Sequence, residues 1–241
     1  MRRDSTTGLY LPRPDSCCFG RPPPLTIDYT TVNHANGGSS SLTGMVRRLQ
    51  LRHERRPDFT PQPIDPRGGL RAITHSEYRQ ARKQHRYLKS RWNYYREAIA
   101  MARQLAPRRV LEIGCRFTPL FPGSDRLDYM AEFRPTILHD ATSVPWPVAD
   151  RAYDLAIALQ VWEHLGNRQR EAFSELVRIA RYAILSLPYK WRRRSNPSHS
   201  GIDDAVVSLW SGGLRPLETV QLPLIGRHKR KIYLFDLDET R

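Results

Sequence analysis

Short apolar runs alternate with polar connections along the second half of the chain, and they predict a mostly parallel β-sheet. Parallel strands are covered on both faces, so they consist of continuous apolar residues rather than alternating apolar and polar ones. We expect strands at residues 109–114, 127–133, 136–142, 154–162, 182–188 and 231–237. The last run has charged flanks, which suit the edge of a sheet.

A different spacing predicts two helices. Large apolar residues recur every three or four positions from residue 76 to residue 106, and Pro107 would end that helix. We interpret its aromatic stripe as a face that packs on the sheet rather than as a surface for stacking nucleobases. A second helix is expected over residues 167–181, with Asn167 as its N-cap. The pattern predicts one α/β domain over residues 76–241, with an N-terminal helix and a Rossmann-like sheet core at residues 109–241.

The first two connections between strands are short for such a fold. About a dozen residues separate the first two predicted strands, and the second connection spans only eight positions, from Glu132 to Asp140. A crossover between parallel strands usually needs a dozen or more residues and contains a helix. We therefore expect shortened first and second crossovers.

Residues 1–75 have the composition of a disordered tail. They contain 9 of the 19 prolines and 7 of the 14 glycines, with few apolar residues at a regular spacing. The first 14 residues lack the apolar stretch of a signal peptide, and no later segment approaches the length of a membrane-spanning helix. From these features we expect a cytoplasmic protein.

The net charge of +15 suits a nucleic-acid partner, but its distribution weakens that interpretation. Residues 1–108 have 20 Lys and Arg against 8 Asp and Glu, whereas residues 109–241 have 19 against 16. Only 5 of the 39 cations are lysines, so a general arginine bias and an anionic partner remain equally open. The three cysteines, Cys17, Cys18 and Cys115, include no C-x-x-C pair, and no metal site is predicted.

Ligands of open α/β sheets bind beyond the carboxyl ends of the strands, and several polar residues fall there. Gly114 follows the first predicted strand, and Glu132 follows it by 18 positions. An acid about 20 residues after such a glycine is where a carboxylate binds a ribose diol. Asp140 and the segment 160–164 end the third and fourth predicted strands at the same rim.

Over about residues 90–241 the chain resembles the class I S-adenosylmethionine-dependent methyltransferases. The resemblance rests on VLEIGC at residues 110–115, on Glu132, on residues 139–165 and on ILSLP at residues 184–188. It implies S-adenosylmethionine as cofactor, with Gly114 at the methionine part, Glu132 at the ribose, and Asp140 and Ala141 at the adenine. The predicted cofactor-binding residues at this rim are Glu112, Gly114, Cys115, Arg116, Glu132, Asp140, Ala141 and Gln160.

The glycine loop departs from a G-x-G-x-x-G pattern, because Arg116 and Pro119 stand where the second and third glycines would be. A dinucleotide has a pyrophosphate that must approach bare backbone, which makes those glycines hard to replace. S-adenosylmethionine has no phosphate. We hypothesise that Arg116 instead donates a charge-assisted hydrogen bond to the carboxylate of the cofactor.

Methyl transfer from a sulfonium mainly requires alignment of donor and acceptor, although a hydroxyl acceptor benefits from a general base. His164 and His199 are the candidate bases, and the loop at residues 190–203, with Trp191 and its arginine run, suits a sugar, phosphorylated or carboxylated acceptor. We predict a methyltransferase that acts on an oxygen or nitrogen nucleophile of a small molecule or glycan. A nucleic-acid methyltransferase is less favoured, because the fourth strand ends in QVWEHL rather than in an Asn/Asp-Pro-Pro-aromatic turn. A non-catalytic scaffold also remains open.

Overall fold

The computed structural model describes residues 71–85, 88, 90–192, 197–225 and 228–240, all within the compact unit His53–Arg241. Most of the predicted tail, residues 1–70, lies outside the described residues. Its last part is described, and there Ala72 and Ile73 are buried in the core. None of the helices in these ranges combines the length and the apolarity that crossing a membrane requires.

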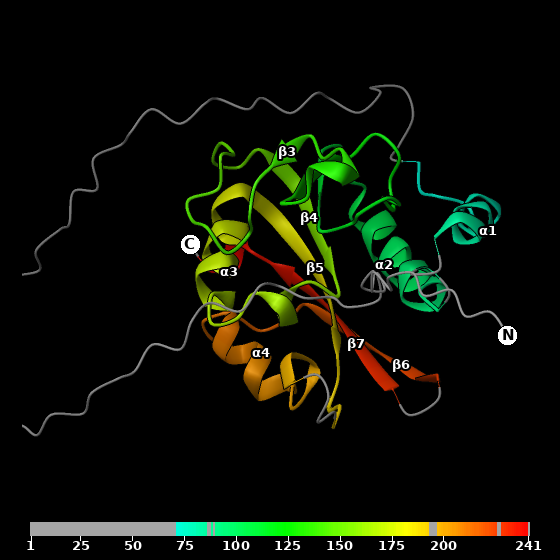
Figure 1. Cartoon of the computed structure of the whole chain (residues 1–241). Helices are drawn as coiled ribbons and strands as arrows, with labels where there is room; N and C mark the ends of the chain where they lie inside the picture. Colours follow the sequence, from blue (N-terminus) through cyan, green and yellow to red (C-terminus); the bar gives the residue numbers. More distant parts are fainter. Residues whose placement is uncertain (1–70, 86–87, 89, 193–196, 226–227, 241) are drawn as a thin grey trace, which may run out of the picture. The chain divides into compact units, whose positions relative to one another are not determined.

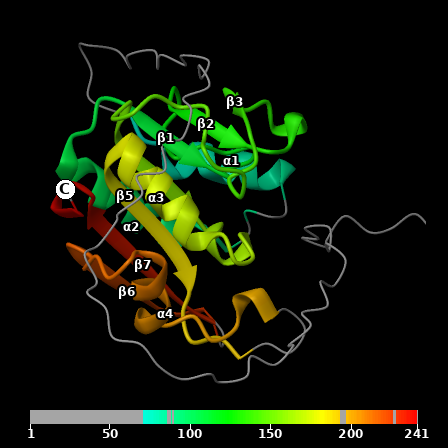
Figure 2. The ribbon, with the colours of Figure 1, turned by 90° about the vertical axis from the view of Figure 1, so that its left-hand side faces the viewer.

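A seven-stranded sheet in the order β3-β2-β1-β4-β5-β7-β6 forms the centre of the domain (Figure 1, Figure 2). Its strands are β1 (Val110–Ile113), β2 (Asp125–Asp128), β3 (Ile137–Leu138), β4 (Tyr153–Leu159), β5 (Ala180–Pro188), β6 (Glu218–Ile225) and β7 (His228–Asp236). The first five strands in this order pair in parallel, and β7 is antiparallel to both of its neighbours. The order 3-2-1-4-5 is that of doubly wound nucleotide-binding sheets, so the predicted α/β, Rossmann-like fold is confirmed.

Three of the strand predictions were wrong in detail. The second strand ends at Asp128 rather than at residue 133, and the third has two residues only. The last predicted strand is not at the edge, because β7 lies between β5 and β6. The true edge strand β6 was not predicted.

The predicted helix over residues 76–106 is two helices, α1 (His75–Gln84) and α2 (Trp92–Leu105). Thr74 begins α1 with a capping box, in which its side chain and that of Glu77 satisfy each other's backbone N–H groups. The second predicted helix is α3 (Gln169–Ile179), and its N-cap is Arg168 rather than Asn167. A fourth helix, α4 (Asp204–Trp210), was not predicted and is capped by the side chain of Asp203.

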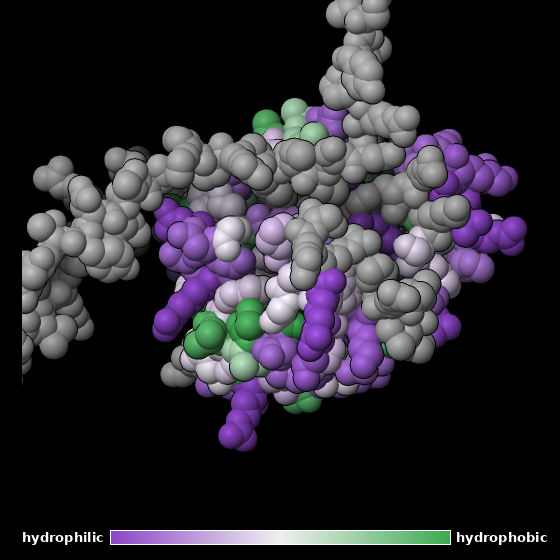
Figure 3. All heavy atoms as spheres, turned by 60° about the horizontal axis from the view of Figure 1, so that its bottom comes forward, coloured by the Kyte–Doolittle hydropathy of each residue, from purple (hydrophilic) through white to green (hydrophobic). Residues whose placement is uncertain are grey.

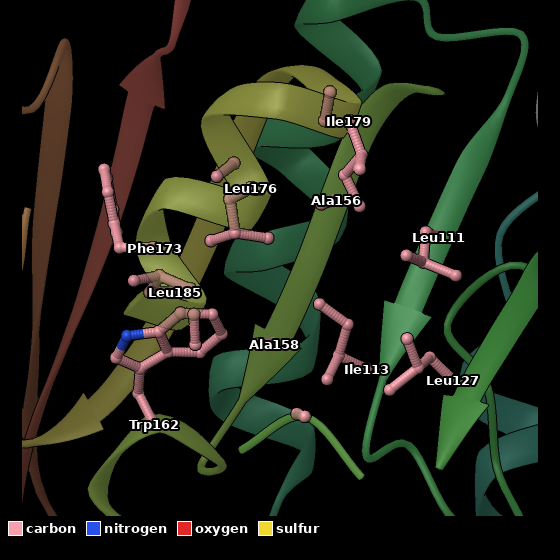
Figure 4. Close-up of a cluster of buried hydrophobic side chains, with 14 of the residues drawn as sticks. Leu111, Ile113, Leu127, Ala156, Ala158, Trp162, Phe173, Leu176, Ile179 and Leu185 are labelled. Atoms are coloured by element: carbon pink, nitrogen blue, oxygen red, sulfur yellow. The ribbon is translucent and has the colours of Figure 1, made fainter. Parts of the chain in front are cut away.

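Each face of the sheet has its own hydrophobic core. In β4, Leu155 and Ile157 face the core of α1 and α2, whereas Ala156 and Ala158 face the core of α3. In Figure 4, Leu176 of α3 belongs to the cluster that packs against these strands. Burial on both faces explains why β4 is a continuous apolar run, since each large apolar side chain removed from water contributes about 1.5–3 kcal/mol.

The outer surface near α4 is mainly hydrophilic. Figure 3 shows this side of the molecule, where a small group of hydrophobic residues is surrounded by hydrophilic ones. Leu209 of α4 is 71% exposed. Its side chain therefore contributes little to the core, whereas the neighbouring Val207 is buried there.

The shortened crossovers are confirmed. All residues from Gly114 to Ser124 are described, and none of them is helical. The connection from β2 to β3 contains only the 3-10 helix η2 (Ala131–Phe133). Loops rather than helices therefore carry the chain over the carboxyl ends of β1 and β2.

Candidate cofactor and acceptor site

Gly114 makes the turn at the end of β1 and cannot be replaced without strain. Its φ is +62°, in the left-handed region that favours glycine, and its N–H donates to the carbonyl of Leu127 at 2.9 Å. A Cβ at this position would lie 2.7 Å from Cγ2 of Val161. The backbone after β1 therefore packs directly against the side chain of Val161, which follows β4, and leaves no room for a Cβ.

Glu112 holds the loop that follows this turn. Its carboxylate is buried and accepts hydrogen bonds from the N–H groups of Leu120 and Phe121, at 2.7 and 2.8 Å, and from the hydroxyl of Ser124 at 2.8 Å. Burial raises the pKa of Glu112 to about 7, against the lowering effect of these bonds. Both carboxylate oxygens thus bind the protein's own loop, which gives Glu112 a positioning role beside the predicted cofactor contact.

The acid at the end of β2 is Asp128, not Glu132. Asp128 is 6% exposed, and its Oδ1 accepts the N–H of Met130 at 3.0 Å. Burial raises its pKa, while the charge of Arg116 acts in the opposite direction. Glu132 lies four positions later, exposed in η2. The prediction that Glu132 ends the second strand was therefore wrong.

Arg116 places a positive charge near the carboxyl ends of β2 and β4. Its φ is +55°, and its guanidinium lies 5.5 Å from the ring centroid of Phe133. Its charge opposes the rise that burial causes in the pKa of Asp128, and it adds to the lowering of the pKa of His164. The guanidinium therefore lies beside Phe133 of η2 and acts electrostatically on the acid of β2 and on the segment after β4.

Asp140 and Ala141 form a fixed turn after β3. The Oδ1 atom of Asp140 accepts both the N–H and the hydroxyl of Thr142 at 2.8 Å. Ala141 is buried, and its carbonyl accepts the indole N–H of Trp146 at 3.1 Å. Trp146 in turn donates its backbone N–H to Glu175 of α3 at 2.7 Å. The turn is thus anchored to the helix that covers the sheet.

Gln160 and Cys115 lie at the same rim. The amide of Gln160 donates to the hydroxyl of Ser186 at 3.1 Å and accepts from Nε of Arg230 at 3.0 Å, so both of its ends bind the protein. Burial raises the pKa of the Cys115 thiol, which stays protonated at neutral pH. A pocket beside the end of β1 is lined by Tyr95, Glu112, Ile113, Gly114, Cys115, Leu120, Ile157 and Leu159.

The two candidate bases lie together. His164 ends the 3-10 helix η3 (Trp162–His164) after β4, and His199 ends η4 (Pro197–His199) in the loop after β5. Their Nε2 atoms are 3.1 Å apart. Burial, with His199 and Arg116 adding to it, lowers the pKa of His164 to about 4. Glu163, which sequence reasoning did not single out, is buried next to them.

The predicted acceptor loop is only partly described. Trp191 is buried, and its indole N–H donates to the carbonyl of Lys229 in β7. Arg192 is exposed, whereas Arg193 and Arg194 lie outside the described residues. Trp191 also packs edge-on against His199, with ring centroids 5.6 Å apart. The loop therefore brings an indole and an imidazole to the end of β4.

Comparison with known proteins gives matches among solved structures only. No protein-family model and no curated protein sequence matches the chain. The N-methyltransferase NodS from Bradyrhizobium japonicum WM9 is 18% identical, over 59% of this chain and 96% of that one, with a TM-score of 0.45. A putative sarcosine dimethylglycine methyltransferase from Galdieria sulphuraria is 11% identical over 59% and 83%, with a TM-score of 0.43.

A cyclase, SpnF, is also among the matches, 15% identical over 47% of this chain and 53% of that one, with a TM-score of 0.35. At such identities and TM-scores these similarities carry no argument about what this chain binds or does. The strand order shows the fold alone: the domain is a doubly wound, Rossmann-like sheet, which is the fold expected from the sequence.

Proposed function

We propose that the protein is an S-adenosylmethionine-dependent methyltransferase that acts on an oxygen or nitrogen nucleophile of a small molecule or glycan. The observation that carries the proposal is the buried carboxylate of Asp128 at the end of β2, next to the turn at Gly114. β1 lies between β2 and β4, where the strand order reverses. Nucleosides bind at such a reversal, beyond the carboxyl ends of the strands.

The residues at this rim suit S-adenosylmethionine better than a dinucleotide. A pyrophosphate needs the N–H groups of a helix N-terminus, and the described loop after β1 has no helix. Asp128 would accept the two hydroxyl protons of the ribose, which replaces the role predicted for Glu132. Arg116 would donate to the carboxylate of the amino-acid part.

When bound, this cofactor supplies an electrophilic methyl group. The task of the chain is then to hold the acceptor in line and to take up its proton. His164 is neutral at pH 7 because its pKa is lowered to about 4, so it can accept a proton, but a base that weak gives little driving force. His199, at hydrogen-bond distance from His164, would share that proton.

Thermal unfolding of the full-length protein with S-adenosylmethionine, S-adenosylhomocysteine, NAD or a short RNA tests the proposal. We expect the first two to raise the Tm and NAD to leave it unchanged, since only a ligand that binds the folded state stabilises it. A rise with RNA but neither adenosyl compound would favour the nucleic-acid alternative. No rise at millimolar S-adenosylmethionine would refute cofactor binding and favour a non-catalytic scaffold.

A further inference from the structure

The side chain of Glu163 is a buried carboxylate without a visible partner. It lies in η3, directly after β4, and the residue is 3% exposed. Neither of its oxygens has a hydrogen-bond partner among the residues that the structure describes. The positive charges of Arg91 and Arg230 act on this carboxylate over a longer range. An ionised carboxylate in such a place is strongly unfavourable unless something pairs with it.

Two imidazoles stand beside this carboxylate at the spacing of metal ligands. The Nε2 atoms of His164 and His199 are 3.1 Å apart. Two nitrogens that bind one ion at about 2.0–2.1 Å, with an angle of about 90–110° between them, are about 2.8–3.4 Å apart. A hydrogen bond between the two rings gives a similar distance, so the unpartnered acid beside them is what points to a cation.

The three side chains form one compact set. One ligand atom from each of Glu163, His164 and His199 lies within 4.8 Å of the other two. They come from two segments that are distant in sequence, η3 after β4 and η4 after β5. A cation placed between them would neutralise the buried acid and would accept a lone pair from each ring.

We propose that Glu163, His164 and His199 bind one divalent transition-metal ion. Two imidazoles and one carboxylate suit Zn²⁺, Mn²⁺, Fe²⁺ or Co²⁺, whereas Mg²⁺ and Ca²⁺ prefer oxygen ligands throughout. Cysteine spacing predicted no metal site, and this set uses no cysteine. Histidines 35 positions apart have no recognisable ligand spacing in the sequence.

Three protein ligands leave open coordination positions, as in catalytic rather than structural metal sites. The open positions would take an oxygen of the acceptor, and the ion would lower the pKa of its proton. This assignment of the acceptor rests on the proposed methyl transfer, whereas metal binding itself does not. This arrangement favours an oxygen nucleophile, which would lose its proton to solvent, attack the methyl group while bound to the ion, and release the thioether of the cofactor. In the metal-bound form His164 and His199 would then be ligands and would not serve as the base.

Titration of Co²⁺ into the full-length, chelator-treated protein tests the site, followed by visible absorption and without cofactor or acceptor. We expect one Co²⁺ per chain and a d–d absorption band, and Zn²⁺ should displace it. Glu163→Gln keeps the shape of the side chain and His199→Ala changes a loop residue, so both should remain folded by circular dichroism. Each should weaken binding by more than about 100-fold.

His139→Ala is the matched control, because His139 lies after β3 and contacts the carbonyl of Ser143 instead of this cluster. Its Co²⁺ affinity should equal that of the wild type. The proposal is overturned if folded wild-type protein gives no band at millimolar Co²⁺, or if both cluster variants bind as tightly as wild type. Co²⁺ binding without any response to S-adenosylmethionine would refute the proposed function but not the metal site. A response to S-adenosylmethionine without Co²⁺ binding would refute the metal site but not the proposed function.

Discussion

Replacing Glu112 should loosen the loop that stands in for the missing first crossover helix. In Glu112→Ala, two buried backbone N–H groups and the hydroxyl of Ser124 lose their acceptor. Each buried donor left unsatisfied costs about 1–3 kcal/mol, and removal of a buried charge offsets part of this. We expect a loss of about 2–5 kcal/mol in the free energy of unfolding at pH 7, measured by urea unfolding with tryptophan fluorescence.

Limited proteolysis should locate this change at residues 115–124. Glu97→Ala serves as the control, since Glu97 only pairs with the exposed Arg96 at 2.7 Å. Exposed pairs of this kind contribute about 0–1 kcal/mol. If Glu112→Ala unfolds within about 0.5 kcal/mol of the wild type, the hydrogen bonds of Glu112 do not support the loop, and the reasoning is wrong.

The titration of Glu112 gives this prediction a second readout. Its pKa is raised from 4.5 to about 7 in the folded state, so its stabilising contribution is complete below pH 4.5 and is lost as the pH rises through about 7. Between pH 5 and pH 8 the wild type should lose about 2–3 kcal/mol relative to Glu112→Gln, which does not titrate. Equal pH dependence of the two proteins would contradict the assigned shift.

Two further substitutions test the first loop. Gly114→Ala should lower the free energy of unfolding by about 1–3 kcal/mol, because of its positive φ and its contact with Val161. In a Val161→Ala background the clash is removed, so adding Gly114→Ala should cost only the penalty of the positive φ. If Gly114→Ala costs as much free energy of unfolding there as in the wild type, Val161 is not the obstacle. Arg116→Ala should raise the Kd for S-adenosylmethionine more than about tenfold in calorimetry, with the exposed Arg134→Ala as control. An unchanged Kd would remove that role of Arg116.

The centre of the sheet was predictable from sequence because both of its faces are buried. β1, β4 and β5 are continuous apolar runs for that reason. Residues 218–221 of β6 alternate between half-buried and exposed, so the signal of this strand is weak. β7 resembled an edge strand because of its charged flank, yet Lys231 binds Asp204 of α4 at 2.7 Å and Arg230 binds Gln160. Those partners come from elements that local spacing does not reveal.

The acid of the second strand was misplaced because the run of largely apolar residues continues beyond the strand. The run from residue 127 to residue 133 looks like one strand, but the carboxylate of Asp128 binds the N–H of Met130 and the chain turns into η2. Phe133 is buried from this turn rather than from the sheet. An apolar run alone does not show where a strand ends and a turn begins, so Glu132 was selected instead of Asp128.

Both histidines were found by their positions after strands, but their contact was not predictable. It depends on the loop after β5 folding back until His199 meets His164. Glu163 gave no signal of its own, since one acid beside a histidine is ordinary in a sequence. What distinguishes it is its burial without a hydrogen-bond partner among the described residues. The proposed metal site therefore follows from the tertiary structure alone.

Isothermal calorimetry of S-adenosylmethionine with three proteins tests the central claim most directly. The wild type and Glu132→Gln should bind alike, because Glu132 is exposed beyond the strand. Asp128→Asn keeps the acceptor for Met130 but loses the charge offered to the ribose, and its Kd should rise at least about tenfold, or about 1.4 kcal/mol. Loss of binding in Glu132→Gln with retention in Asp128→Asn, or no heat from the wild type at millimolar ligand, would contradict the account.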